Sequence, residues 1–340
     1  MMLQTLLAPL ALIYKGVTIV RNTLFDHDIL LHERTAPVAT LCIGNLAVGG
    51  TGKTPHTEWV VGMLLEQGLK VATLSRGYGR RTKGYVAADE HSTAETIGDE
   101  PLQMYRHFAG RIPVSVCEDR CEGVRRLNEA HPDLDVVVLD DAFQHRYLKP
   151  TARILLTDYS RPYYTDHVLP WGRLRESAQG ASRADIIIVT KCPRDLSSEE
   201  RAAIIERLQP EAHQSVFFSA IGYAPCEVAA KGSRIVLLTG IAHPEPLRRW
   251  LEGEDCHIVH HLRYPDHHRF SERDLRDIAA ASQEADAVVT TAKDYARLSS
   301  ARLDASVMDK IIVQDIRPEI LFGEDEKLIQ NLKNYVDPNT

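Results

Sequence analysis

The sequence predicts an α/β protein whose main part is a doubly wound, mostly parallel sheet of the P-loop NTPase type. Short apolar runs, typical of buried parallel strands, alternate with helical patterns from residue 38 to about residue 220. One of these runs, 38–43, is followed by a glycine-rich turn and then a helix, which is the order of a phosphate-binding loop. Beyond Tyr223 the pattern changes, so we expect a second, smaller α/β domain there.

At 340 residues the chain is too long for one small core. We expect residues 1–35 to form an N-terminal helical segment and 36–223 to form the P-loop domain. Residues 224–340 would form the smaller domain, with the final helix either inside it or packed back on the first domain. The predicted strands are 38–43, 71–75, 113–116, 136–139, 154–157, 186–190, 215–219, 235–238, 257–261, 287–291 and 311–313. The predicted helices include 57–67, 121–129, 198–208, 246–252 and 271–284.

The first twenty residues are unusually apolar, and this segment has two interpretations. The chain lacks the basic start and the cleavage site of a signal peptide. Pro9 and Gly16 interrupt any membrane span. An amphipathic helix in a membrane interface and a helix packed on its own domain both remain open. The apolar residues with helical spacing are Leu3, Leu6, Leu7, Leu10 and Ile13.

The bulk composition excludes some classes of partner and of site. The net charge is −7, which gives no reason to expect nucleic acid as a partner. Six cysteines are scattered along the chain, and their spacing fits no zinc site. We therefore expect reduced thiols in a cytosolic protein. A basic cluster between residues 70 and 83 fits either an anionic substrate or a solvated loop.

The turn GNLAVGGTGKTP, residues 44–55, predicts a nucleotide site. Lys53 would reach the β- and γ-phosphates, and the hydroxyl of Thr54 would bind Mg²⁺. The strict pattern has a glycine where this chain has Ala47, but three later glycines still let the backbone close around phosphate. The predicted ATP-binding residues are Ala47, Val48, Gly49, Gly50, Thr51, Gly52, Lys53 and Thr54.

Carboxylates and histidines elsewhere add candidates for metal binding and proton transfer. Asp140 and Asp141 follow the predicted strand 136–139, where a P-loop enzyme holds Mg²⁺. Asp99 and its neighbour Glu100 begin a predicted helix, so they fit a metal site, a general base or a simple helix cap. His267 stands beside a carboxylate in the second domain, an arrangement that suits a general base.

Eight motifs occur in order along the chain: AVGGTGKTP, LSRGYGR, GDEP, DDAFQHRYLKP, LPWGRLRE, TGIAHP, YPDHHRF and TTAKDYARL. Together they resemble the tetraacyldisaccharide 4′-kinase family of lipid A biosynthesis, and the resemblance covers nearly the whole chain. It implies a kinase that uses Mg²⁺ and ATP to phosphorylate the 4′-hydroxyl of a tetraacyldisaccharide 1-phosphate. It also implies a peripheral enzyme on the cytoplasmic face of the bacterial inner membrane, whose N-terminal helix binds an anionic membrane surface.

The resemblance also assigns roles residue by residue. Asp99 and His267 match the family's acid–histidine dyad, and Lys53 is a further catalytic residue. Asp99, shielded or polarised by His267, is the predicted base for the acceptor hydroxyl. Asp140 and Asp141 match the metal-binding pair, together with Thr54.

The predicted substrate residues are Arg76, in the Arg-Gly-Tyr-Gly turn, and Arg175 and Glu176, in the Leu-Arg-Glu motif. A P-loop GTPase or switch protein is an alternative, but the spacing around Lys293 and Asp294 does not match a guanine-reading motif. An unrelated sugar or nucleoside kinase is the other alternative, and the apolar N-terminus argues against it.

Overall fold

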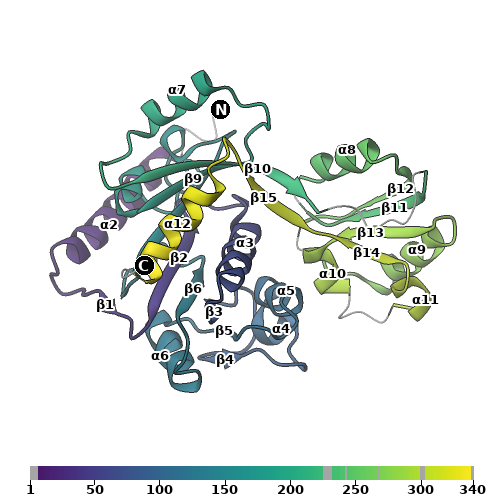
Figure 1. The fold of residues 1–340 in the computed structure, drawn as a ribbon, viewed down its shortest axis with the longest axis horizontal. Coiled ribbons are helices and arrows are strands. Elements are labelled where there is room, and N and C mark those ends of the chain that lie inside the picture. Colours follow the sequence, from purple (N-terminus) through teal and green to yellow (C-terminus); the bar gives the residue numbers. More distant parts are fainter. Residues whose placement is uncertain (1–6, 225–231, 242, 267, 299–302, 338–340) are drawn as a thin grey trace.

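The computed structural model of the protein describes residues 7–224, 232–241, 243–266, 268–298 and 303–337. Two main sheets, of nine and four strands, lie side by side and are joined where β10 and β15 lead toward the smaller sheet (Figure 1). In spatial order the large sheet contains β15 (Ile316–Ile320), β10 (Ser215–Tyr223), β9 (Ile186–Thr190), β8 (Ala152–Asp158), β2 (Ala39–Asn45), β6 (Val136–Asp140), β3 (Val71–Ser75), β5 (Val114–Val116) and β4 (Val86–Ala87). A short pair, β1 (Arg34–Thr35) and β7 (Leu148–Lys149), lies apart.

The large sheet is parallel except at its two edges, where β15 and β4 run antiparallel to their neighbours. Its central strands are buried on both faces, as their continuous apolar sequences predict. In β2, for example, Leu41 and Ile43 enter one core, whereas Cys42 between them enters the other. Because the strands are parallel, the loops that follow β2, β3, β5 and β6 meet at one edge.

Helices cover both faces of the large sheet, which confirms the doubly wound α/β class. One face packs against α3 (Lys53–Glu66), α5 (Asp99–His107) and α12 (Asp325–Val336). The other packs against α6 (Arg120–Ala130), α7 (Ser198–Leu208) and α2 (Ala8–Asp26). Shorter elements are α4 (Ala94–Ile97), η1 (Tyr163–Thr165) and η2 (Ala178–Arg183).

The smaller sheet is entirely parallel and is also sandwiched by helices. Its order is β12 (His257–Arg263), β11 (Arg234–Thr239), β13 (Ala287–Thr291) and β14 (Ile311–Gln314). One face packs against α8 (Glu245–Gly253). The other packs against α9 (Glu272–Ser282), α10 (Ala292–Leu298) and α11 (Ala305–Met308). All the predicted strands are present, with boundaries that differ by at most a few residues.

The last part of the chain returns to the large sheet. Strand β15 pairs with β10, and α12 buries Leu328 and Leu332 against the face that α3 also covers. This return accounts for the final helix, which the sequence left open. It also means that two separate segments connect the sheets, one after β10 and one before β15 (Figure 1).

Helix α2 lies on the large sheet through a narrow face and exposes apolar side chains on its other face. Ala11 and Phe25 are buried, whereas Leu10, Ile13 and Val17 are 56%, 66% and 63% exposed. Leu3 and Leu6 of the predicted apolar stripe lie outside the described residues. In the part of the chain that the structure describes, no helix is both long enough and apolar enough to span a bilayer.

Candidate active site

The glycine-rich turn forms a loop between β2 and α3, as predicted. Gly49 and Gly52 have φ angles of 109° and 87°, a left-handed region that favours glycine. Ala47 does not need that freedom, because it has no positive φ and instead pairs with Leu174 through an isolated β-bridge. The alanine in place of the first glycine is therefore compatible with the loop.

We call the cavity above this loop the loop cleft. It has a volume of about 400 Å³ and lies between the loop and the smaller sheet. Residues from Gly49 to Thr54 line one side, and Asp266 and Lys293 line the other. The Nζ atom of Lys293 lies 3.0 Å from Oδ1 of Asp266. The loop cleft is thus lined by two lysines, Lys53 on the loop and Lys293 on the opposite side, and both carry a charge that suits phosphate.

A second cavity, which we call the helix cleft, lies between α2 and the carboxyl ends of β3 and β6. Its volume is about 780 Å³. Tyr14 and Arg21 on α2 line it on one side, and Arg76 lines it on the other. The two clefts share a wall made by Tyr78, Glu100, Asp141 and Arg175. A group bound in one cleft can therefore meet a group bound in the other at this wall.

Of the predicted acidic pair, Asp141 belongs to this wall and Asp140 lines the helix cleft beside it, and the pKa values of their carboxyl groups differ. Burial, reinforced by the charges of Glu100 and Asp141, raises the pKa of Asp140 to about 7. Burial alone would raise the pKa of Asp141 too. The positive charges of Lys53 and Arg175 outweigh this effect and hold the pKa of that carboxyl below its ordinary value. Oδ1 of Asp141 lies 2.8 Å from the Arg175 guanidinium and 3.9 Å from Nζ of Lys53.

The residues predicted to bind substrate all line the helix cleft, with different surroundings. Arg175 reaches Asp141, as described above. Glu176 is almost completely buried and accepts hydrogen bonds from Asn22 on α2 (2.6 Å), from Gln144 (3.1 Å) and from Arg183 (2.8 Å). These bonds attach α2 to the large sheet, so Glu176 builds the wall of the cleft.

The predicted base Asp99 begins α5 and faces the smaller sheet. One of its carboxylate oxygens accepts a hydrogen bond of 3.1 Å from Arg297 on α10. Its neighbour Glu100 lines both clefts. His267, the predicted partner of Asp99, lies outside the described residues. The adjacent His268 stacks on Tyr264 and lies 3.0 Å from an oxygen of Asp274.

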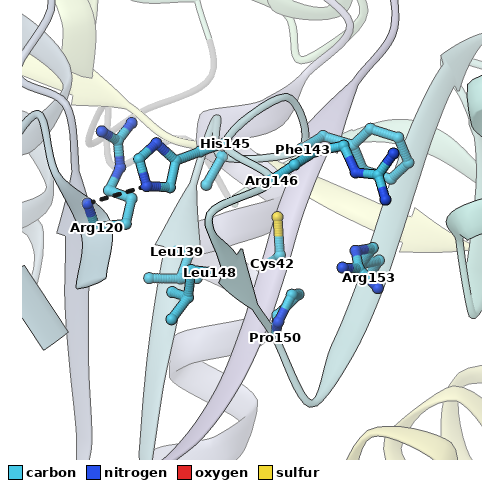
Figure 2. Close-up of a pocket in the computed structure, with 10 residues that line it drawn as sticks. Cys42, Arg120, Leu139, Phe143, His145, Arg146, Leu148, Pro150 and Arg153 are labelled. Atoms are coloured by element: carbon cyan, nitrogen blue, oxygen red, sulfur yellow. Dashed lines mark hydrogen bonds between the residues drawn. The ribbon is translucent and has the colours of Figure 1, made fainter. Parts of the chain in front are cut away.

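Arg120 is a residue of the helix cleft that sequence reasoning missed. The residue is only 3% exposed, and its guanidinium donates hydrogen bonds to the carbonyl groups of Cys117 and Glu118. Its buried Nε has no hydrogen-bond partner among the described residues. Figure 2 shows Arg120 beside His145, whose Nε2 accepts a hydrogen bond of 3.3 Å from the Arg120 backbone N–H.

Burial lowers the pKa of His145 to about 4, so this histidine is neutral near pH 7. Burial and then the charge of Arg76 lower the pKa of Arg120 as well. Arg120 and Arg76 thus bring two positive charges close together in the helix cleft. The position of Arg120, shortly after the predicted strand 113–116, was the signal that could have identified it. Asp140 was predicted in the same way, because it directly follows the predicted strand 136–139.

Comparisons with known proteins show the family to which the chain belongs. Residues 3–337 match the model of the family described as tetraacyldisaccharide-1-P 4′-kinase, LpxK. A tetraacyldisaccharide 4′-kinase from Bacteroides thetaiotaomicron is 42% identical, over 98% of this chain and 93% of the relative. One from Flavobacterium johnsoniae is 41% identical over 99% of both chains.

A solved structure of LpxK from Aquifex aeolicus, described as a complex with ATP, has the same fold. Its TM-score is 0.74, with 24% identity, over 98% of this chain and 99% of that chain. The family match over nearly the whole chain confirms the resemblance seen in the sequence motifs. The chain belongs to the tetraacyldisaccharide-1-phosphate 4′-kinase family, and it is a kinase, a phosphotransferase that acts on a hydroxyl group.

Proposed function

We propose that the chain transfers the γ-phosphoryl group of ATP to the 4′-hydroxyl of a tetraacyldisaccharide 1-phosphate, with ATP in the loop cleft and the lipid headgroup in the helix cleft. The observation that carries this proposal is the shared wall, because it brings a phosphate donor and a hydroxyl acceptor to one point. Membership in the family leaves the switch protein and the unrelated sugar kinase without support.

Oxygen ligands around the loop cleft fit a magnesium ion. Thr54, Glu100 and Asp141 line this cleft, and Asp140 lies next to them at the end of β6. Hydroxyl and carboxylate oxygens are the donors that Mg²⁺ prefers. We propose that Thr54 and the Asp140–Asp141 pair hold it. When bound, the ion neutralises charge on the β- and γ-phosphates.

The phosphates of ATP would lie along the N–H groups of the loop, with Lys53 against the β- and γ-phosphates. Phosphoryl transfer depends mostly on positioning and on charge stabilisation. The Lys53 side chain is 12% exposed and lies 3.9 Å from Asp141, so it is held at the shared wall. We expect Lys53 to move little when the nucleotide binds.

Asp99 is the proposed base. The oxygen of the 4′-hydroxyl forms a bond to the γ-phosphorus while the bond to the β-phosphate oxygen breaks and ADP leaves. The hydroxyl proton passes to the carboxylate of Asp99. Arg297 donates to one carboxylate oxygen, so it orients Asp99, and the partnership of Asp99 with His267 remains part of the proposal.

The arginines of the helix cleft suit the 1-phosphate of the acceptor. Arg120 offers a buried guanidinium, and Arg76 and Arg21 line the same cleft. Guanidinium groups bind phosphate through parallel charge-assisted hydrogen bonds. The sugar rings would then span the cleft between this end and the shared wall.

The acyl chains and the membrane explain the exposed face of α2. Leu10, Ile13 and Val17 lie on the outer side of the same helix whose inner side lines the helix cleft. A helix of this kind lies in the interface of a bilayer with its apolar face among the acyl chains. We propose that the protein binds the anionic cytoplasmic face of the inner membrane peripherally and draws its acceptor from that layer.

A product assay tests this function. The purified full chain is incubated with γ-labelled ATP, Mg²⁺ and tetraacyldisaccharide 1-phosphate in detergent micelles. A labelled bisphosphate lipid is expected, and a matched acceptor with a blocked 4′-hydroxyl should stay unlabelled. Label on free phosphate alone, or label transferred equally to the blocked acceptor, would contradict the proposal.

A further inference from the structure

Side chains from outside the glycine-rich loop hold three consecutive carbonyl groups of that loop. The carbonyl of Gly50 accepts a hydrogen bond from Nζ of Lys191. The carbonyl of Thr51 accepts one of 2.9 Å from Oγ1 of Thr190. The carbonyl of Gly52 lies 2.7 Å from Nδ1 of His56. The residues that supply these three donors lie outside the eight motifs.

The two donors at the end of β9 are fixed in place by their surroundings. Thr190 is the last residue of β9 and is completely buried. Lys191 follows it with a φ of 59°, in the left-handed region, which turns its side chain back toward the loop. Nζ of Lys191 also lies 2.8 Å from Oδ2 of Asp158, at the end of β8. This ion pair holds the ammonium next to Gly50.

The third donor, His56, is fixed by a partner on each ring nitrogen. Its Nε2 lies 2.9 Å from the hydroxyl of Ser219 on β10. A carbonyl oxygen only accepts, so Nδ1 carries the proton toward Gly52, and Nε2 accepts from Ser219. Burial lowers the pKa of His56 to about 4, so the ring keeps this neutral form near pH 7.

These bonds have a consequence for anion binding. A loop carbonyl that turned into the cleft would place its oxygen against phosphate oxygens and repel them. Holding the carbonyl groups of Gly50, Thr51 and Gly52 toward β9 and α3 keeps the loop in one conformation. Its N–H groups then stay available to the phosphates before the nucleotide arrives. Preorganisation of this kind lowers the cost of binding.

We propose that Lys191, Thr190 and His56 are positioning residues that preorganise the glycine-rich loop for the phosphates of ATP and thereby set the affinity for the nucleotide. Lys191 acts through the Gly50 carbonyl and is itself oriented by Asp158. This proposal rests on the ATP binding proposed above for the loop cleft. It assigns no role in acceptor binding to any of the three residues.

The test compares isosteric and conservative variants of Thr190, at the end of β9, and of Lys191, which follows it. Lys191→Met removes the ammonium and keeps the stem, whereas Lys191→Arg keeps a charged donor. Thr190→Val removes the hydroxyl and keeps the shape, whereas Thr190→Ser keeps the hydroxyl. Lys70→Met is the matched control, because Lys70 makes an exposed ion pair of 2.7 Å with Asp133 away from both clefts.

Calorimetry with ATP and Mg²⁺ measures Kd for the purified full chain, and initial rates give kcat and both KM values. Lys191→Met should raise Kd and KM for ATP tenfold or more, and Thr190→Val about fivefold. We expect kcat at saturating ATP and KM for the lipid to stay within threefold of the wild type. Lys191→Arg and Thr190→Ser should restore most of the affinity, and Lys70→Met should change nothing.

An ATP Kd within twofold of the wild type for both Lys191→Met and Thr190→Val would overturn the proposal. So would an equal rise in KM for ATP and for the lipid, since that pattern indicates a general loss of structure. If Lys191→Met does not fold, Thr190→Val decides, because it removes a single hydroxyl. Intact ATP binding without lipid phosphorylation would count against the proposed function and would leave the calorimetric comparison valid.

Discussion

Replacing Arg120 by methionine tests whether the helix cleft binds the 1-phosphate of the acceptor. Arg120 is buried, and its Nε lacks a hydrogen-bond partner, although carbonyl groups accept from its Nη1. Burial lowers the pKa of Arg120, and the neighbouring positive charge of Arg76 lowers it further. An anion that bound here would accept a hydrogen bond from Nε and offset the positive charge, whereas a neutral sugar would leave that charge uncompensated.

The magnitude follows from the kind of bond that is lost. A hydrogen bond between charged groups contributes about 1.5–3 kcal/mol. At about 1.4 kcal/mol for each factor of ten, its removal corresponds to a rise of roughly 10- to 100-fold in KM for the lipid. Arg120 does not line the loop cleft, in which we propose that ATP binds. Therefore KM for ATP should stay unchanged.

The assay measures initial rates for the wild type and Arg120→Met with two acceptors, one with and one without the 1-phosphate. The variant should be impaired with the phosphorylated acceptor and nearly equal to the wild type with the other. Arg120→Lys should recover part of the loss because it retains the charge. An equal impairment with both acceptors would refute the reasoning, since the phosphate would then have no part in the effect.

Three further predictions concern the base, a buried acid and the membrane. Asp99→Ala should lower kcat by at least about 100-fold with little change in KM for ATP, and a turnover near that of the wild type would remove Asp99 from the role of base. Burial raises the pKa of Glu58 from 4.5 to about 8, so the folded state retains a proton that the unfolded chain releases. The contribution of protonated Glu58 to the free energy of unfolding is complete below pH 4.5 and is lost as the pH rises through 8. Glu58→Gln should therefore gain on the order of 3 kcal/mol of unfolding free energy over the wild type between pH 5 and pH 8. Urea titrations at both pH values measure this, and a pH-independent difference would contradict it. The triple variant Leu10→Ser, Ile13→Ser, Val17→Ser should no longer sediment with anionic vesicles, and its KM for the lipid should rise. Its thermal midpoint should stay the same, because all three side chains are exposed. Continued sedimentation of this variant would exclude α2 as the membrane contact.

Much of the fold could be predicted because its signals are local. Buried parallel strands need continuous apolar runs such as 136–139 and 186–190, and these runs appear in the structure as β6 and β9. The order of strand, glycine-rich turn and helix at residues 44–55 likewise depends on neighbours in sequence. Strand β15 was not predicted, because Arg317 and Pro318 interrupt its apolar pattern at an antiparallel edge.

The site was only partly predictable, because its electrostatics depend on residues distant in sequence. The motifs identified Lys53 and the Asp140–Asp141 pair. They did not show that the charges of Lys53 and Arg175 outweigh burial at Asp141 whereas burial dominates at Asp140, nor that Arg120 is buried in the wall of the helix cleft. Desolvation depends on every atom that packs around a group, and no short motif records it.

The sequence by itself determined the nucleotide loop, the class of fold and the family, since these depend on contiguous residues and on the order of motifs. The tertiary structure decided that β15 and α12 return to the large sheet, that α2 forms a wall of the helix cleft, and that the two clefts meet at Asp141. It also decided that three donors outside the loop hold the loop carbonyls. The physical reason is that most of these features are contacts between segments distant in sequence, which only the packing of the sheets and helices brings together.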